Sequence, residues 1–370
     1  MSYQLNEKIR GLTPYDPISG DYKIRLDANE SFLDTASLLG EQLCQAVSRA
    51  ALNRYPDPYA VRLVQMFSDY YHLDPQTVCA GNGSDELIGI LVAAFMEKGD
   101  KLLTTAPDFS MYRFYASIYE DINLIEQKND ALEIHVDSLI DRCNREKARM
   151  LVFSNPCNPT SLALKREEVL RLVENVSALV VVDEAYMDFA DTSLYSVLDC
   201  AGKEQYSNLV VLKTCSKALG CAGIRLGFTV STLPITNAVK AVKSPYNVNS
   251  VTQAIGEAIF GSPQLLEEGI QKLIEAREDL YQRILALQKK YSVLERVCRP
   301  QTNFVFLKVA AKSRAAACAG EPSGAAMIFR QLLDRSIAVR HMGEYLRISA
   351  GSPEENAAVD RALDEILRNM

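Results

Sequence analysis

The sequence predicts an α/β protein: a large domain with a mostly parallel central sheet flanked by helices, and a smaller α+β domain. Short apolar runs alternate with helical patterns up to about Pro245, and this alternation is typical of βα units. Beyond Pro245 the pattern changes to long helices, a strand and a β pair. A chain of 370 residues also exceeds one small core, so two domains are expected. We expect an N-terminal arm (1–30) associated with the small domain, the large domain (31–245) and the small domain (246–370).

Each element follows from its local pattern of apolar residues. The strands expected in the large domain are 78–80, 101–105, 122–125, 149–154, 178–182 and 209–212. Its expected helices are 36–52, 60–71, 87–96, one after 112, 136–144 and 165–175. In the small domain we expect helices at 250–260, 263–290, 327–335 and 353–368, and strands at 302–308, 337–340 and 345–349. The Ala-, Ser- and Gly-rich segment 310–326 is expected to be a surface loop that leads into a helix.

Charge and cysteine content exclude several classes of protein. The net charge of −7 and the pI near 5.3 argue against a nucleic-acid or anionic-membrane partner, because both require a basic surface. No apolar run reaches the length of a membrane span, and the N-terminus lacks the apolar core of a signal peptide. The nine cysteines are scattered and form no C-x-x-C pair. They favour reduced thiols in a cytoplasmic protein over a metal cluster or a disulfide framework.

The segment 208–227 carries the first chemical signal. After a short β-branched run it contains Thr214, Ser216, Lys217, Gly220, Gly223, Arg225 and Gly227. Small residues allow close backbone approach to a ligand, and hydroxyls with an arginine suit a phosphate. A lysine after a buried strand can be a nucleophilic amine. We therefore expect Lys217 to hold a phosphorylated carbonyl cofactor as a Schiff base. Lys203 lies in a polar loop and Lys213 at the strand end, so both are weaker candidates.

Polar or aromatic residues also follow the other predicted strands. Asn158 lies in a turn with two Asn-Pro pairs, Phe109 lies just beyond a strand, and Asp183 and Tyr186 follow an apolar run. The glycine-rich turn 81–86 enters a helix, whose N-terminal N–H groups can bind an anion. Taken singly, each residue could be a helix cap or a core side chain. Ligands bind at the carboxyl edge of open α/β sheets, so together they predict one site there.

These residue types suit pyridoxal phosphate. An acid must keep the pyridine nitrogen protonated, which fits Asp183, and Tyr186 and Asn158 can donate to the ring hydroxyl oxygen. The phosphate requires N–H groups, hydroxyls and a cation, which the chain offers at Ser84, Asp85, Ser216 and Arg225. Once a substrate amine displaces it, Lys217 would move the proton from the substrate Cα.

Two arginines of the small domain are candidate substrate contacts. Arg340 and Arg347 lie on adjacent predicted strands and could bind anionic ends of a substrate. Surface ion pairing is the alternative. Alternation places Arg347 opposite the face of Leu346 and Ile348, which leaves open whether it faces solvent or a cleft.

Two other classes of protein fit less well. A nicotinamide-dependent dehydrogenase requires a complete dinucleotide fingerprint, but Glu86 stands where its last glycine belongs. A non-catalytic binding or regulatory protein on this scaffold predicts loss of the lysine or the acid, and both Lys217 and Asp183 are present.

The motifs of the chain resemble those of a known family. LTPYDP, LDANES, RYPDP, GNGSDE, NPCNPT, VVVDEAY, TCSKALGCAGIRLG and YLRISAG occur in this order between Leu12 and Gly351. The set closely resembles the fold-type I pyridoxal phosphate aminotransferases, and PYDP and RYPDP favour their histidinol-phosphate branch. The resemblance implies amino transfer between L-histidinol phosphate and 2-oxoglutarate, in histidine biosynthesis, by a homodimer with shared active sites. Threonine-phosphate decarboxylases and some aromatic amino acid aminotransferases share nearly all these motifs and remain alternatives.

The resemblance also implies residue roles. The catalytic set would be Lys217, Asp183 and Tyr186. The cofactor-binding set would be Tyr55, Gly83, Ser84, Asp85, Phe109, Asn158, Asp183, Tyr186, Thr214, Ser216, Lys217 and Arg225. Within it, Phe109 would stack on the cofactor ring and Tyr55 would reach the cofactor phosphate of the other subunit. The substrate contacts would be Tyr15, Asn29, Arg340 and Arg347.

Among the substrate contacts, the resemblance gives Arg347 a carboxylate, either of the substrate or of 2-oxoglutarate. Tyr15 and Arg340 would contact the phosphate of histidinol phosphate. Three positions depart from the family pattern: Phe109 stands where Tyr is usual, Ser161 replaces the Gly of N-P-T-G, and Leu219 replaces an aromatic residue. The last two departures remove no chemical group that the mechanism needs.

Overall fold

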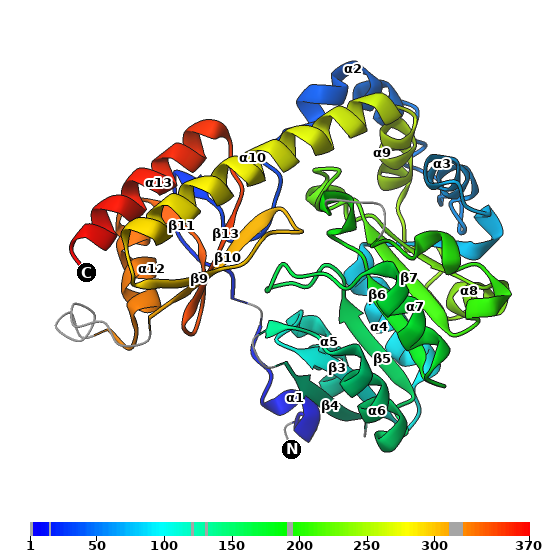
Figure 1. The fold of residues 1–370 in the computed structure, drawn as a ribbon. Coiled ribbons are helices and arrows are strands. Elements are labelled where there is room, and N and C mark those ends of the chain that lie inside the picture. The colour runs from blue at the N-terminus through cyan, green and yellow to red at the C-terminus, as the bar shows by residue number, and fades with distance from the viewer. Residues whose placement is uncertain (1–2, 15, 120–121, 130–131, 191–194, 311–320) are drawn as a thin grey trace.

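The computed structural model describes residues 3–14, 16–119, 122–129, 132–190, 195–310 and 321–370. The chain forms a large α/β unit and a smaller α+β unit, and the long helix α10 (Pro263–Lys290) runs from one to the other (Figure 1). This architecture confirms the predicted fold class. No helix within the described ranges is both long and apolar enough to cross a membrane.

The large unit is built on a 7-stranded sheet with the order β2-β8-β7-β6-β5-β3-β4. Its strands are β2 (Val78–Gly81), β3 (Lys101–Ala106), β4 (Asn123–Lys128), β5 (Met150–Ser154), β6 (Leu179–Asp183), β7 (Leu209–Thr214) and β8 (Gly227–Ser231). Neighbouring strands from β7 to β4 pair in parallel, whereas β8 pairs antiparallel with β7 and β2. The sheet is therefore mostly parallel, with its antiparallel pairs at one edge.

Helices cover both faces of this sheet because successive strand side chains point to opposite sides. Phe153 belongs to the buried cluster of one face, and its neighbour Val152 belongs to the cluster of the other. The first cluster draws on α2 (Thr35–Ser48), α3 (Val61–Tyr71), α6 (Val136–Glu146), α7 (Arg166–Glu174) and α9 (Ser250–Phe260). The second draws on α4 (Ser84–Phe95), α5 (Ser110–Ile118) and α8 (Leu233–Val242).

The small unit contains an antiparallel 4-stranded sheet with the order β12-β13-β10-β9. Its strands are β9 (Leu294–Val297), β10 (Phe304–Val309), β12 (Arg340–Met342) and β13 (Tyr345–Ser349). The core of this unit lies between the sheet and three helices: α10, α12 (Gly324–Asp334) and α13 (Pro353–Arg368). Leu280, Ile328 and Leu363 are fully buried members of this core.

The N-terminal segment touches both units. Strand β1 (Ile24–Arg25) pairs in parallel with β11 (Ile337–Ala338), which favours the predicted association of the arm with the small domain. Helix α1 (Glu7–Arg10), in contrast, lies beside α5 of the large unit (Figure 1).

Val248 and Phe260 belong to the core of the large unit, so the packing favours a boundary later than residue 245. The limits 1–30, 31–245 and 246–370 stay a proposal.

Several predicted elements match closely, and others shift. The helices at 250–260, 263–290 and 353–368 are confirmed at both ends. The helix expected from residue 87 begins at Ser84, so the end of the glycine-rich turn forms its first turn. Strands β8 and β9 and helix α8 were not predicted; β8 has only 5 residues directly after a glycine-rich loop, and so short an apolar run carries a weak signal. Most of the segment 310–326 lies outside the described residues, and α12 begins at Gly324.

A buried ion pair lies at the end of β7. The Lys213 side chain is 3% exposed, and its Nζ donates to both carboxylate oxygens of Asp188 at 2.8 Å. The Tyr71 hydroxyl donates to the same carboxylate at 3.2 Å, and Lys213 Nζ lies 5.1 Å from the Tyr71 ring centroid. The Lys213 amine is therefore engaged in this buried ion pair.

We predict that Lys213→Met destabilises the protein by about 3–5 kcal/mol, because it leaves the buried Asp188 carboxylate without its cation. Lys203→Met is the matched control, since Lys203 pairs with Asp199 where both side chains are exposed; its cost should stay below about 1 kcal/mol. Urea unfolding of both variants without cofactor gives the two free energies. Equal losses would show that burial of the Lys213 pair contributes nothing.

Candidate active site

The carboxyl ends of three parallel strands place the predicted residues together. Strands β5, β6 and β7 end at Ser154, Asp183 and Thr214, and Ser154 lies opposite Asp183 in the sheet register. The loops after these strands carry Asn158, Tyr186 and Lys217. All three strands are almost fully buried, so polar groups gather where the strands stop.

Lys217 presents an amine that is held by neutral groups. Its Nζ donates to the carbonyl oxygen of Ala28 at 3.1 Å and lies 5.9 Å from the centroid of the Tyr186 ring. Within the described ranges no carboxylate forms an ion pair with it. A carbonyl oxygen and an aromatic face hold the amine in place without a permanent counter-ion, which suits a nucleophilic lysine.

Tyr186 and Asn29 join the two units beside Lys217. Asn29 Nδ2 donates to the Tyr186 hydroxyl at 2.9 Å. The Asn29 backbone N–H donates to Ser349 Oγ at 3.0 Å, and Asn303 Nδ2 donates to the Asn29 carbonyl oxygen at 3.0 Å. Asn29 is buried and has a φ of 56°. The structure thus places Asn29 at a junction of arm, sheet and small unit; its contact with substrate stays a prediction.

Asp183 is a buried acid whose carboxylate accepts hydrogen bonds from neutral donors. Its carboxylate accepts the N–H of Ala185 at 3.1 Å and the hydroxyl of Tyr112 at 3.1 Å. Burial raises the pKa of Asp183 to about 6, although the Ala185 N–H acts to lower it. A protonated ring nitrogen set against this carboxylate would offset the cost of burying its charge. Tyr112 was not singled out in the sequence, because a helical aromatic residue looks like ordinary core.

Asp108 links the loops that carry Phe109 and Asn158, and sequence reasoning missed it. Its carboxylate accepts Thr105 Oγ1 at 2.5 Å and the Phe109 N–H at 2.7 Å, and it also bonds the Ser154 hydroxyl. Ser154 Oγ in turn accepts the N–H of Asn158 at 3.0 Å. Burial raises the pKa of Asp108 to about 7. The available signal was an acid shortly after a strand, but it was weaker than for Asp183, because Asp108 lies two residues beyond the end of β3.

Ser161 shows how the chain accommodates its departure from N-P-T-G. The residue has a φ of 62°, in the left-handed region that glycine adopts at no steric cost. Its hydroxyl lies 2.5 Å from Thr302 Oγ1 and accepts the Gln301 N–H at 3.0 Å. The serine therefore keeps the turn of a glycine and adds hydrogen bonds between the large and small units.

The glycine-rich turn 81–86, which leads into α4, presents backbone N–H groups that can bind an anion, and we call this region the cup. Gly83 is the N-cap of this helix and no side chain caps it, so the first N–H groups point outward without a partner from a cap. Gly83 has a φ of 88°, and a Cβ there would lie 2.8 Å from Arg225 Nη2. A Cβ at Gly227 would overlap the backbone nitrogen of Ser84. The two glycines thus let the arginine and the helix N-terminus approach closely.

Hydroxyl groups complete this cup. Thr214 is directly opposite Gly227 in the sheet, and Gly227 is opposite Gly81. Thr214 Oγ1 donates to Ser216 Oγ at 3.1 Å and accepts the Ser216 N–H at 3.2 Å. Backbone N–H groups, hydroxyls and a guanidinium in one place are the donor set that a phosphate binds.

The two predicted arginines lie opposite each other on β12 and β13. Arg347 donates to Asn158 Oδ1 at 2.7 Å and to the carbonyl oxygen of Asp27 at 2.7 Å, so it points toward the large unit and the N-terminal segment. Arg340 is half-buried and forms no hydrogen bond or ion pair with another described residue. Two cations side by side repel each other unless an anion lies between them or beside them.

Of the remaining predicted residues, Tyr55 is not brought into this site, whereas Phe109 adjoins it through the bond of its N–H to Asp108. Tyr55 is 81% exposed and stacks on Tyr246 with ring centroids 4.6 Å apart. Tyr15 lies outside the described residues. Phe109 is half-buried at the start of α5, with its ring perpendicular to that of Tyr112.

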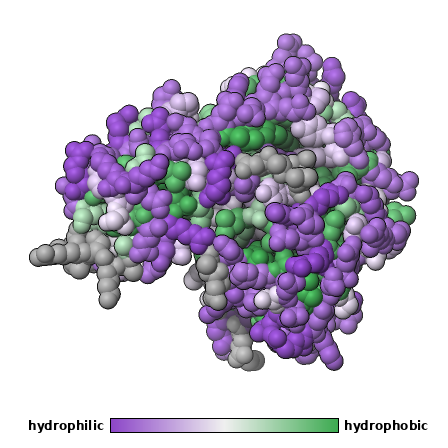
Figure 2. All heavy atoms as spheres, in the orientation of Figure 1, coloured by the Kyte–Doolittle hydropathy of each residue, from purple (hydrophilic) through white to green (hydrophobic). Residues whose placement is uncertain are grey.

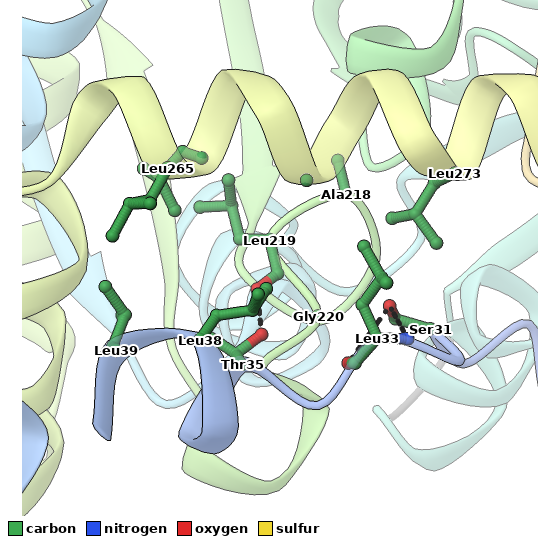
Figure 3. Close-up of a pocket in the computed structure, with 12 residues that line it drawn as sticks. Ser31, Leu33, Thr35, Leu38, Leu39, Ala218, Leu219, Gly220, Leu265 and Leu273 are labelled. Carbon is green, nitrogen blue, oxygen red and sulfur yellow. Dashed lines mark hydrogen bonds between the residues drawn. The ribbon is translucent and has the colours of Figure 1, made fainter.

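A small apolar cavity lies behind the Lys217 loop (Figure 3). It has a volume of about 20 Å³ and is lined mainly by leucines of the N-terminal segment, the loop and α10, including Leu33, Leu219 and Leu273. Figure 2 shows apolar surface in the hollow beneath α10. None of its described lining residues is titratable, so the cavity supports packing and not chemistry.

The described residues fit pyridoxal phosphate. Its phosphate requires N–H groups and a cation, which the uncapped N-terminus of α4 and the close approach of Arg225 to Gly83 offer. Its ring nitrogen requires an acid, which the buried Asp183 offers, held by neutral donors. Its carbonyl carbon requires an amine, which Lys217 offers, held by a carbonyl oxygen.

Comparisons with known proteins agree with this geometry. The family model for aminotransferases of class I and II matches residues 21–366. A histidinol-phosphate aminotransferase of Clostridium kluyveri is 36% identical over 367 residues, which cover 98% of each protein.

Two solved structures share the fold. A histidinol-phosphate aminotransferase from Sinorhizobium meliloti in complex with pyridoxal-5'-phosphate has a TM-score of 0.85 at 22% identity, covering 100% of this chain and 98% of that one. An L-threonine-O-3-phosphate decarboxylase from Porphyromonas gingivalis has a TM-score of 0.74 at 21% identity, covering 93% and 99%. The match of the family model and the relative at 36% identity place the chain among enzymes of one class. The chain belongs to the class I and II aminotransferase family, which confirms the predicted enzyme class and its pyridoxal phosphate cofactor.

Proposed function

We propose that the protein transfers the amino group of L-histidinol phosphate to 2-oxoglutarate, a step of histidine biosynthesis. The observation that carries this proposal is the facing pair Arg340 and Arg347 at the Lys217 site. One substrate carries a phosphate and the other carries carboxylates, and guanidinium groups bind both. The near full-length similarity to the Clostridium kluyveri enzyme supports the same substrates.

Lys217 is the group that moves protons. Pyridoxal phosphate, when bound, supplies an electron sink that makes the substrate Cα acidic. The Lys217 amine would hold the cofactor and, once a substrate amine displaced it, would be available to accept the substrate Cα proton and return it. Among the described residues its hydrogen-bond partner is the Ala28 carbonyl oxygen, so the amine is free to exchange partners.

Asp183, Tyr186 and Asn158 orient the reacting group. The Asp183 carboxylate, fixed by Tyr112 and Ala185, would face the ring nitrogen. The Tyr186 hydroxyl accepts a hydrogen bond from Asn29 and keeps its own proton for the ring oxygen. Asn158 Oδ1 accepts from Arg347, which leaves the Asn158 amide N–H groups to donate. These hydrogen bonds preorganise the donors before substrate arrives.

The phosphate of the cofactor would be held by the cup before α4. The N–H groups of Ser84 and Asp85 lie at the positive end of the helix, with Ser216, Thr214 and Arg225 beside them. Phe109 would cover one face of the ring. The bound phosphate would then supply an anion for the Arg225 guanidinium.

We infer that two copies form a homodimer in which each Tyr55 serves the other site. Tyr55 is far more exposed than an aromatic residue usually is, and Leu52 and Val61 on either side of it are 76% and 62% exposed. Exposed apolar residues clustered in one loop and at the start of the next helix indicate a surface that another protein covers. Cytoplasmic location stays a prediction; the eight cysteines of the described ranges are free thiols.

We predict that Lys217→Ala abolishes the cofactor chromophore that borohydride fixes to the chain, because the amine that would carry it is gone. Lys203→Ala is the control, since its exposed amine pairs with Asp199, and it should retain the chromophore. Absorption spectra before and after borohydride, with mass spectrometry of the reduced protein, locate the attachment. A wild-type protein without the chromophore, or a Lys217→Ala variant that keeps it, would contradict the assignment of Lys217.

Arg340→Gln should raise the KM for histidinol phosphate about 10- to 100-fold, the effect of losing a charged hydrogen bond of about 1.5–3 kcal/mol. The glutamate half-reaction should change much less. Arg335→Gln is the control, because Arg335 pairs with Glu365 on the surface of the small unit. Steady-state kinetics with histidinol phosphate and with O-phosphothreonine decide the substrate. Turnover of O-phosphothreonine alone would refute the proposed function in favour of the decarboxylase.

Shared sites predict complementation between inactive subunits. Lys217→Ala and Tyr55→Ala homodimers should both be impaired, but a mixed dimer contains one site with an intact Lys217 and the partner's intact tyrosine. Refolding equal amounts together should restore about a quarter of wild-type activity, the statistical share of complete sites. Activity that stays at the sum of the two separate variants would argue against shared sites.

A further inference from the structure

A chain of hydrogen bonds joins three segments of the large unit that are far apart in the sequence. Its centre is Lys243, at the end of α8, whose Nζ donates to the Pro58 carbonyl oxygen at 2.7 Å and to Asn247 Oδ1 at 2.8 Å. Pro58 belongs to the loop of Tyr55. One buried ammonium group therefore connects the Tyr55 loop to the segment after α8.

The same chain continues into the phosphate cup. Asn247 Nδ2 donates to Glu86 Oε2 at 2.8 Å, and the backbone N–H of Asn82 donates to the same oxygen at 2.6 Å. Glu86 lies in the first turn of α4, and Asn82 precedes the cap residue Gly83. Glu86 thus holds the backbone of the turn whose N–H groups face the predicted phosphate.

Burial makes the Lys243 contacts important. Lys243 is 7% exposed, and burial lowers its pKa. It forms no ion pair with a carboxylate in the described part of the chain, so its protons depend on the Pro58 carbonyl and the Asn247 amide. A buried ammonium group is costly unless its protons are bonded. Displacing either loop would therefore expose this ammonium group to solvent or leave it buried without a hydrogen-bond acceptor.

The Tyr55 loop is held on its other side as well. Tyr55 stacks on Tyr246, with an angle of 19° between the rings, and Tyr246 has a φ of 61° that few non-glycine residues adopt. Gln253 Nε2 donates to the carbonyl oxygens of Asp57 and Val248, at 2.8 and 2.9 Å. The segment 243–249 is therefore a rigid bridge between the Tyr55 loop and α9.

We propose that Lys243, Asn247 and Glu86 are positioning residues for the cofactor phosphate. They hold the N–H groups of the turn before α4 in place, and they fix the distance between this turn and the Tyr55 loop, which serves the other subunit. The inference rests on the proposed function, since it assumes that the cup binds the phosphate of pyridoxal phosphate. It adds residues that touch neither the cofactor nor the substrate.

Asn247→Ala tests this role because it breaks the link between Lys243 and Glu86 without changing any charge. Asn249→Ala is the matched control: Asn249 lies two residues further on, caps α9 through its bonds to Thr252, and takes no part in the bonds between Lys243, Asn247 and Glu86. We measure pyridoxal phosphate affinity of each apoprotein by fluorescence titration, its melting temperature, and the ³¹P resonance of the bound cofactor. Asn247→Ser serves as a milder second variant.

Asn247→Ala should weaken pyridoxal phosphate binding about tenfold, the effect of one hydrogen bond to a charged group, and should shift the ³¹P resonance. Asn249→Ala should lower the melting temperature through its lost cap but leave the affinity within about twofold. Equal affinities for Asn247→Ala and wild type, or equal weakening in both variants, would overturn the inference. A wild-type protein that does not bind pyridoxal phosphate would instead refute the proposed function.

Discussion

The rest of the structure depends on one constraint: both faces of the central sheet are buried, so polar side chains that bind ligands must lie at the ends of its strands. Strands β5, β6 and β7 are covered by helices on both faces, so a charged side chain within them must be paired, as Lys213 is with Asp188. Because these strands are parallel, their carboxyl ends lie on the same side. The acid, the amide and the amine of the site therefore meet, although they lie far apart in the sequence.

The second unit closes this edge through a few polar contacts. Asn29 connects Tyr186 with Ser349, Arg347 reaches Asn158, and Ser161 bonds Thr302. These bonds run between large and small units directly beside Lys217. The predicted site therefore lies where the two units meet, with the proposed substrate contacts Arg340 and Arg347 on the small unit and the proposed cofactor-binding residues on the large one.

Buried acids at this edge accept hydrogen bonds from neutral donors. The Asp183 carboxylate accepts hydrogen bonds from the Ala185 N–H and the Tyr112 hydroxyl. The Asp108 carboxylate accepts them from the Thr105 hydroxyl and the Phe109 N–H. The Glu184 carboxylate accepts them from the Ser196 hydroxyl and the Val197 N–H. Burial raises the pKa of Glu184 to about 7, close to that of Asp108. Such neutral donors fix the carboxylates in position while leaving Asp183 free to receive a positive group. The positive charges Lys217, Arg225 and Arg347 can then serve ligands.

The sequence by itself determined the fold class, most elements and the chemical groups of the site. Long periodic helices such as 263–290 and apolar strands such as that before Asp183 were predictable because their patterns are local. Lys217, Asp183 and the turn at Gly83 could be proposed from the sequence because each residue type suits one part of the cofactor. Short elements such as β8 were not, since 5 residues carry little pattern.

Only the tertiary structure decided which groups support that chemistry. Asp108, Tyr112 and Lys243 look like ordinary polar or core residues in the sequence, and their importance comes from partners that are distant along the chain. The structure also showed that Ser161 replaces a glycine by adopting its φ, and that Asn29 holds a junction. The physical reason is general: residue type and spacing encode local conformation, whereas hydrogen-bond partners and burial exist only once distant segments have packed together.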